Sequence, residues 1–287
     1  MREATNIEAL RKRYHREICR RILSSRKGVP NLADVSSHTS RTLAESMVKK
    51  LEGPLCKKPP SGQTVGMLFA GITMQFLNEA FKLLHHLRPG KWIFSASQAP
   101  GGISSYDQYE HLAILDAALE KHRDLRALFG GEYIIRPDIV IGREPLTDPE
   151  INSVHDVLGT GDVAKLTSLR RKNYRNPRPI LHATVSCKWT IRSDRSQNTR
   201  TEALNLIRNR KGKTPHIVSV TAEPMPTRIA SLAMGTGDID CVYHMALQEL
   251  SSSVEENRNE DQRDMLDLLV TGKRLRDISD LPFDLVS

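Results

Sequence analysis

The sequence predicts an α/β fold in which a mixed central β-sheet is flanked by helices and preceded by a helical N-terminal part. Three observations lead to this prediction. Four short β-branched runs lie in the second half of the chain, helical patterns separate them, and the first half shows mainly helical periodicity. At 287 residues with 39% hydrophobic residues, the chain is long enough to bury a substantial core. We expect a single domain over residues 1–287, helical to about residue 130, with its core over 131–287.

The first half is assigned in chain order from periodicity and from helix-breaking residues. Apolar residues recur at helical spacing from Thr64 to Leu87, and the helix should stop at Pro89 and Gly90. Gly130 and Gly131 should end a later helix. The expected helices are 5–25, 41–52, 64–87 and 107–129, and the expected loops are 26–40 and 53–63.

The second half alternates strands with helices, which favours a sheet flanked by helices. Pro226 is well placed to open a helix, because the first helical position needs no backbone donor. The expected strands are 133–141, 180–191, 216–222 and 239–244, and the expected helices are 200–210, 226–234, 244–257 and 260–271.

Composition limits the classes of function. No run of 18 apolar residues occurs, so no membrane span is expected, and the charged N-terminus does not resemble a secretory signal. Four scattered cysteines argue against a disulfide framework or a zinc site and fit a reducing cytoplasm. The net charge of +8 and the basic runs 169–179 and 208–213 suit either solvated loops or a surface that faces phosphates.

The predicted strand 180–191 alternates regularly. One face carries apolar residues and the other carries polar residues, among them Ser186 and Lys188, so we expect the polar face to meet solvent or a cleft. A lysine on an exposed edge strand that prevents aggregation is the simpler reading of Lys188.

Carboxylates near this lysine favour a second reading. Asp138 lies inside the predicted strand 133–141, and on adjacent strands Asp138 and Lys188 would place an oxygen ligand for a divalent metal beside an ammonium group. Glu202, at the expected start of the next helix, could add a second carboxylate. Thr199 and Glu202 also match a capping box, and the two roles are compatible.

The surrounding motifs are more specific. SCKWTIRSDR, NLIRNRKGKTPHIV, VTAEPMPTRI, GTGDIDCVYH and GKRLRDISDLP resemble the NgoMIV-like, CCGG-cutting type II restriction endonucleases of the PD-(D/E)xK superfamily. The resemblance covers most of the chain and is weaker in the first 60 residues. It implies a restriction-endonuclease-like core in a cytoplasmic bacterial protein that acts as a homotetramer of two dimers on double-stranded DNA.

The resemblance also implies catalytic roles. Mg²⁺ would be bound by Asp138, Glu202 and the main-chain carbonyl of Cys187. Lys188 would be the catalytic lysine. Ser186 stands where other superfamily members carry an acid. The implied chemistry is hydrolysis of a DNA phosphodiester by metal-activated water, which leaves a 5′-phosphate.

Base recognition is implied for the RSDR run. Arginine forks match guanine O6 and N7, and aspartate accepts from cytosine N4, so Arg192, Asp194 and Arg195 would read CCGG in a symmetric dimer. A charged loop that caps the next helix is the alternative. Residues matching Asp34, Ser36 and Arg228 would contact an outer G·C pair and Gln63 the minor groove, which favours GCCGGC, although Asp34 and Ser36 also suit a plain turn.

One position departs from the family pattern. The family carries a glutamate on the long helix where this chain has Ala70, which cannot bind a metal. We expect position 70 to lie off the main apolar stripe of that helix. Cleavage would then be impaired, and a DNA-binding protein that has lost cleavage is one alternative function. A repair-type nuclease that shares only the core is another.

Overall fold

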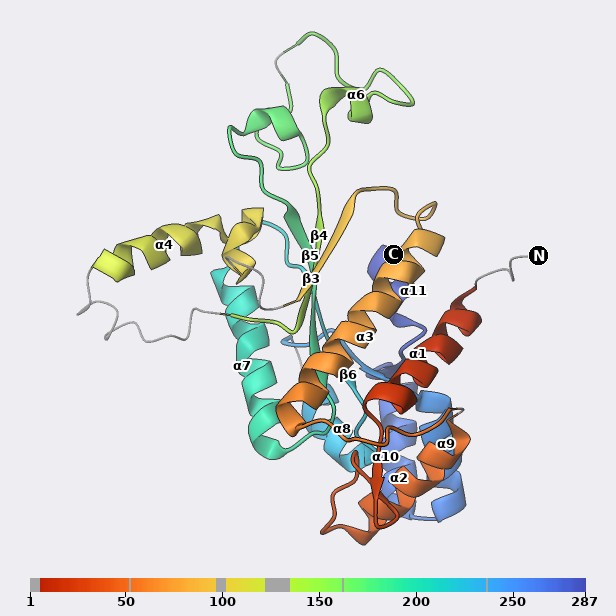
Figure 1. Ribbon diagram of the computed structural model, residues 1–287. Coiled ribbons are helices and arrows are strands. Elements are labelled where there is room, and N and C mark those ends of the chain that lie inside the picture. Colours follow the sequence, from red (N-terminus) through yellow and green to blue (C-terminus); the bar gives the residue numbers. More distant parts are fainter. Residues whose placement is uncertain (1–5, 52, 97–101, 122–134, 162, 236) are drawn as a thin grey trace. The chain divides into compact units, whose positions relative to one another are not determined.

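The computed structural model describes residues 6–51, 53–96, 102–121, 135–161, 163–235 and 237–287 (Figure 1). The chain forms two compact units that interleave in sequence. Unit 1 comprises Met1–Pro89, Val185–Ala203 and His216–Ser287, and unit 2 comprises Gly90–Thr184 and Leu204–Pro215. Among the described residues, none of the helices combines the length and the apolar character that crossing a bilayer requires.

Unit 1 begins with three helices whose first turns are capped by polar side chains. Asn6, Ser37 and Ser61 each accept a hydrogen bond from a backbone N–H in the first turn, which satisfies a donor that has no partner within the helix. α1 lies beside α3 (Figure 1). These elements are α1 (Ile7–Arg21), the hairpin β1 (Ser25–Arg26) and β2 (Val29–Pro30), α2 (His38–Lys50) and α3 (Gly62–Leu83).

A six-stranded mixed sheet runs in the order β3-β4-β5-β6-β7-β8. β3 and β4 are antiparallel, whereas β6 is parallel to β7 and β7 is parallel to β8. The strands are β3 (Trp92–Ala96), β4 (Ile139–Arg143), β5 (Ile180–Lys188), β6 (His216–Thr221), β7 (Cys241–His244) and β8 (Leu275–Asp277). The predicted class, a mixed sheet with flanking helices, is therefore confirmed.

The other helices lie between the strands or after them in the sequence. Pro226 opens α8, as its sequence position predicts. The helices are α4 (Glu110–Lys121), α6 (Asp148–Ile151), α7 (Ser193–Asn209), α8 (Pro226–Ala233), α9 (Leu247–Asn257), α10 (Glu260–Thr271) and α11 (Leu281–Val286), with short 3-10 turns at Gly102–Ser105, Asp107–Tyr109 and Arg171–Asn173. The expected helix end at Gly130 and Gly131 lies outside the described residues.

The prediction for strand 180–191 was wrong about its polar face. β5 is an interior strand rather than an edge, and every residue from Leu181 to Cys187 is buried. His182 is buried because its ring packs on Trp92, with 4.8 Å between ring centroids. The edge-strand reading of Lys188 is therefore excluded.

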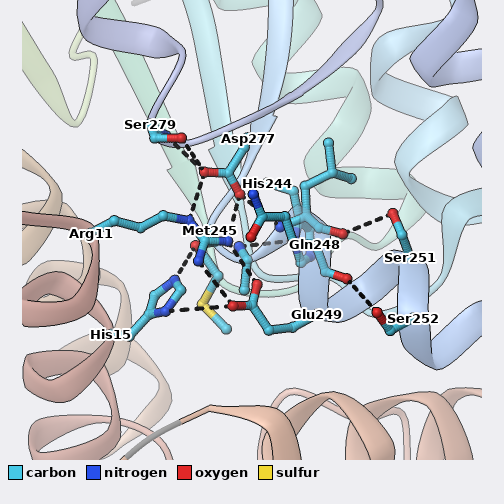
Figure 2. Close-up of polar contacts among 12 residues, drawn as sticks. Arg11, His15, His244, Met245, Gln248, Glu249, Ser251, Ser252, Asp277 and Ser279 are labelled. Atoms are coloured by element: carbon cyan, nitrogen blue, oxygen red, sulfur yellow. Dashed lines mark hydrogen bonds and ion pairs between the residues drawn. The ribbon is translucent and has the colours of Figure 1, made fainter. Parts of the chain in front are cut away.

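A buried ion cluster ties α1 to distant parts of unit 1 (Figure 2). The Arg11 guanidinium donates Nε and Nη2 to Asp277 at 2.8 Å each, and Nη1 and Nη2 to Glu249 at 2.9 and 2.7 Å. Asp277 also accepts the N–H of Leu247 at 3.0 Å, which caps the first turn of α9 from β8. Glu249 thus shares the Arg11 guanidinium with Asp277, and Asp277 has a neutral donor as well, so both buried charges are paired.

Candidate active site and nucleic-acid interface

The C-terminal end of β5 is held firmly against β6 within unit 1. The Ser219 hydroxyl donates to the carbonyl of Ser186 at 3.1 Å, and the N–H of Ala222 donates to the carbonyl of Lys188 at 3.3 Å. Lys188 is the last residue of β5 and is half-buried. Its backbone is therefore fixed where the strand opens into the RSDR segment.

The hydroxyl group of Ser186 is buried. Its Oγ has no hydrogen-bond partner among the groups that the structure describes. Burying an unsatisfied hydroxyl costs about 1–3 kcal/mol, so such atoms are few in native structures. Ser186 thus carries a buried hydroxyl directly before Cys187 and Lys188 in the sequence.

The two predicted carboxylates belong to different units. Asp138 lies in unit 2 at a bend immediately before β4, and not within the strand as predicted. Glu202 lies in unit 1, inside α7 rather than at its start. The predicted capping box was therefore wrong: α7 already begins at Ser193, and Thr199 is a buried residue of the helix body.

The donor atoms on these residues suit a hard cation. Asp138, Glu202 and the carbonyl of Cys187 offer oxygen, which Mg²⁺ prefers. Over the described ranges, no three His, Cys, Asp or Glu side chains gather in a metal-binding group. That is compatible with Mg²⁺, which is commonly held by one or two carboxylates, with water and substrate phosphate completing its coordination.

Ala70 does not lie where the sequence pattern suggested. It is only 8% exposed and belongs to the buried side of α3. The reason is that α3 packs on two sides: Phe69 meets Trp189 edge-on at 5.3 Å between ring centroids, and Thr73 hydrogen-bonds Tyr14 of α1 at 3.1 Å. A side chain at position 70 is consequently shielded from water.

The segment between β5 and α7 is positioned by its buried residues. Trp189 packs on Phe69 and donates its indole N–H to the carbonyl of Asn31 at 3.3 Å. Arg192, which follows buried Ile191, is exposed. Asp194 and Arg195 lie in the first turn of α7, and their side chains lie outside the described part of the structure.

The structure brings together three residues predicted to serve one outer base pair. Arg228 of α8 forms an ion pair with Asp34, 194 residues away in sequence. Asp34 also accepts the Ser36 hydroxyl at 2.7 Å and the Ser36 N–H at 3.0 Å, so the predicted turn is present as well. Hydrogen bonds from Arg228 and then from Ser36 hold the pKa of Asp34 well below its ordinary value.

Gln63 makes no hydrogen bond to this cluster in the described part of the structure, and it is exposed in the first turn of α3. One residue near the cluster was not anticipated from the sequence. Glu223 is fully buried after β6, and burial raises the pKa of its carboxyl to about 7. The available signal was an acid directly after the apolar run of that strand, in VTAEP.

Comparison with known proteins identifies the family. The family model described as NgoMIV restriction enzyme matches residues 14–287. The chain belongs to the NgoMIV restriction enzyme family. Its relative, the type II restriction enzyme NgoMIV from Neisseria gonorrhoeae, is 46% identical over 266 residues, which is 92% of each chain. All candidate residues above fall inside the family match, and the restriction-endonuclease-like α/β core is confirmed for this NgoMIV-family chain.

A solved structure also overlaps part of this NgoMIV-family chain. It is described as a restriction endonuclease PspGI–substrate DNA complex and covers 36% of this chain and 39% of its own. The TM-score is 0.24 at 17% identity, a likeness too small to support any argument about the site.

Proposed function

We propose that this chain is a type II restriction endonuclease that hydrolyses double-stranded DNA at the CCGG-containing palindrome GCCGGC. The observation that carries the proposal is the family match across residues 14–287. The site supports it, because Lys188 and Arg192 occupy one short segment whose backbone is fixed by buried contacts. Cleavage chemistry and base readout would then be set by the same few residues.

Recognition of the inner bases is assigned to Arg192, Asp194 and Arg195. Arg192 is exposed, as a side chain that enters a major groove must be. Arginine donates two hydrogen bonds to guanine and aspartate accepts one from cytosine, so the three side chains supply the donors and acceptors that CCGG presents. The symmetric counterpart in a dimer would read the other half of the palindrome.

The outer G·C pair is assigned to Arg228, Asp34 and Ser36, with Gln63 directed to the minor groove. Arg228 and Asp34 are 32% and 30% exposed, so both remain accessible. A carboxylate offers about four acceptor positions, and Asp34 already accepts from Ser36 twice and from Arg228. One position is left for cytosine N4, while further donors of Arg228 face the paired guanine.

Catalysis is assigned to Lys188, which would offset the charge of the scissile phosphate and orient the attacking water. Asp138, Glu202 and the carbonyl of Cys187 would hold Mg²⁺, which, when bound, activates water and stabilises the charge that develops on the phosphate. Ser186 is assigned to this site by its place on β5 directly before the Cys187 carbonyl and Lys188.

Ala70 favours a second candidate, a sequence-specific DNA-binding protein with weak or absent cleavage. An alanine supplies no charge where the family carries a glutamate, and binding to bases does not depend on that position. A homotetramer of two dimers in the bacterial cytoplasm completes the proposal.

Two measurements test this function. In competition binding, GCCGGC duplex should be preferred over duplexes with one changed pair, and Arg192→Ala should lose about 1–3 kcal/mol of that discrimination. Arg20→Ala is the matched control, because Arg20 is an exposed arginine of α1 that has no predicted role in DNA binding. A plasmid digest with Mg²⁺, with the ends sequenced, tests cleavage. Full CCGG preference in Arg192→Ala would contradict the assignment.

A further inference from the structure

Glu223 is a buried acid that the catalytic assignments leave unused. It follows β6 and is 0% exposed. Burying a carboxyl group is unfavourable unless its oxygens receive hydrogen bonds, and an apolar side chain of similar volume would commonly be at least as stable there. The presence of an acid at this position therefore needs an explanation beyond core packing.

The two carboxyl oxygens accept backbone N–H groups from two different segments. Oε2 accepts the N–H of Ile191 at 2.9 Å, and Oε1 accepts the N–H of Met225 at 3.3 Å. Ile191 directly precedes Arg192. Met225 directly precedes the first residue of α8, the helix that carries Arg228. One side chain thus spans the starts of both predicted recognition segments.

The backbone of Glu223 is itself fixed. Its N–H donates to the Thr221 hydroxyl at 3.1 Å, and His244 lies with Nε2 3.2 Å from its carbonyl. Burial lowers the pKa of His244 to about 4, so the ring is neutral at physiological pH. The N–H of Ala246 points at Nδ1 from 3.1 Å, which leaves the ring proton on Nε2, where it can donate to Glu223.

We propose that Glu223 is a positioning residue for specificity, which holds the Arg192 segment and the start of α8 in one register so that inner and outer base pairs are read together. This inference rests on the function proposed above. The charged groups that act on the carboxyl are Arg228 of α8 and Asp34 from the loop after β2, and His244 of β7 meets its carbonyl. All of these residues lie in unit 1.

The pH dependence of recognition follows from the carboxyl group. Because the pKa of Glu223 is raised to about 7, chiefly by burial, the group is protonated below that pH and ionised above it. An ionised carboxylate accepts both N–H groups fully, whereas protonation occupies one oxygen. Preference for GCCGGC should therefore increase between pH 6 and pH 8.

The test compares Glu223→Gln with wild type by competition binding at pH 6 and pH 8. The glutamine amide keeps the shape of the glutamate side chain but offers only one acceptor oxygen in place of two. At pH 8, preference for GCCGGC over a duplex with a changed inner pair, and over one with a changed outer pair, should each fall at least about tenfold. Affinity for unrelated duplex should stay within about twofold, and the preference of the variant should not change with pH. Glu255→Gln, an exposed acid on α9, should behave like wild type.

The outcomes distinguish a failure of the proposed function from a failure of the positioning role of Glu223. Wild type without preference for GCCGGC overturns the proposed function. A selective wild type whose variant is equally selective at both pH values overturns the inference alone. Equal loss of affinity for specific and unrelated duplexes shows that Glu223 is only structural. If Glu223→Gln does not fold, Glu223→Asp decides, because the shorter acid keeps the charge but cannot reach both N–H groups; unchanged preference at pH 8 would then refute the inference.

Discussion

Replacing Arg11 with methionine should destabilise the fold strongly. The change removes the guanidinium but keeps much of the apolar stem, so Glu249 and Asp277 lose their shared partner while packing is largely retained. The side chains of Arg11, Glu249 and Asp277 are 11%, 15% and 8% exposed, so water cannot replace the lost contacts. Breaking such a buried pair costs about 3–5 kcal/mol.

The loss should depend on pH in a defined direction. Burial raises the pKa values of Asp277 and Glu249, but Arg11 outweighs burial, and both are lowered in the native protein. Their contribution to stability is therefore present above their unfolded values of about 3.9 and 4.3 and is lost as pH falls through the native values. Without Arg11, burial raises the pKa of both acids against only the neutral hydrogen bonds that Asp277 keeps from Leu247 and Ser279. The deficit of the variant should therefore grow from pH 5 to pH 8.

Urea unfolding followed by circular dichroism at both pH values measures this effect. Arg20→Met is the matched control, because Arg20 pairs with Glu17 on the exposed side of the same helix and should contribute no more than about 1 kcal/mol. The reasoning is refuted if Arg11→Met loses less than about 1 kcal/mol at pH 8, or if its loss is the same at both pH values.

Three further outcomes are expected. Asp138→Ala and Lys188→Ala should abolish cleavage in Mg²⁺ while specific DNA binding persists, and appreciable cutting by Asp138→Ala would remove it from the metal site. Single-turnover assays should show that Ala70→Glu cleaves at least about tenfold faster, which corresponds to roughly 1.4 kcal/mol of barrier, and equal rates would contradict a role for position 70. Light scattering should find two duplexes bound per protein tetramer at micromolar concentration, and a stable dimer with one duplex would exclude that assembly.

The fold was predictable wherever a long element had a strong local pattern. The periodic stretch over 64–87 gave α3, and the β-branched runs gave β5, β6 and β7. β3 and β8 were missed, and both owe their structure to partners distant in sequence. WIFSA becomes a strand by pairing with β4, and the three charged and apolar residues of β8 are ordered by β7 and by the contacts of Asp277.

In the site, too, the features set by adjacent residues were predictable, whereas those set by residues distant in sequence were not. RSDR can be recognised in the sequence because its residues are adjacent, and Pro226 marks the start of α8. The ion pair of Asp34 with Arg228 and the two bonds of Glu223 depend on tertiary packing that local patterns do not encode. The capping-box prediction failed because α7 extends further towards its N-terminus than the apolar periodicity indicated.

The buried ion cluster around Arg11 also limits how early during synthesis unit 1 can fold. Arg11 must meet Glu249 and Asp277, 238 and 266 residues later in the chain, and unit 1 draws on three separate stretches. At about 5–20 residues per second of synthesis, the N-terminal helix waits on the order of tens of seconds for these partners. Unit 1 therefore cannot be completed while its last strand is still in the ribosome.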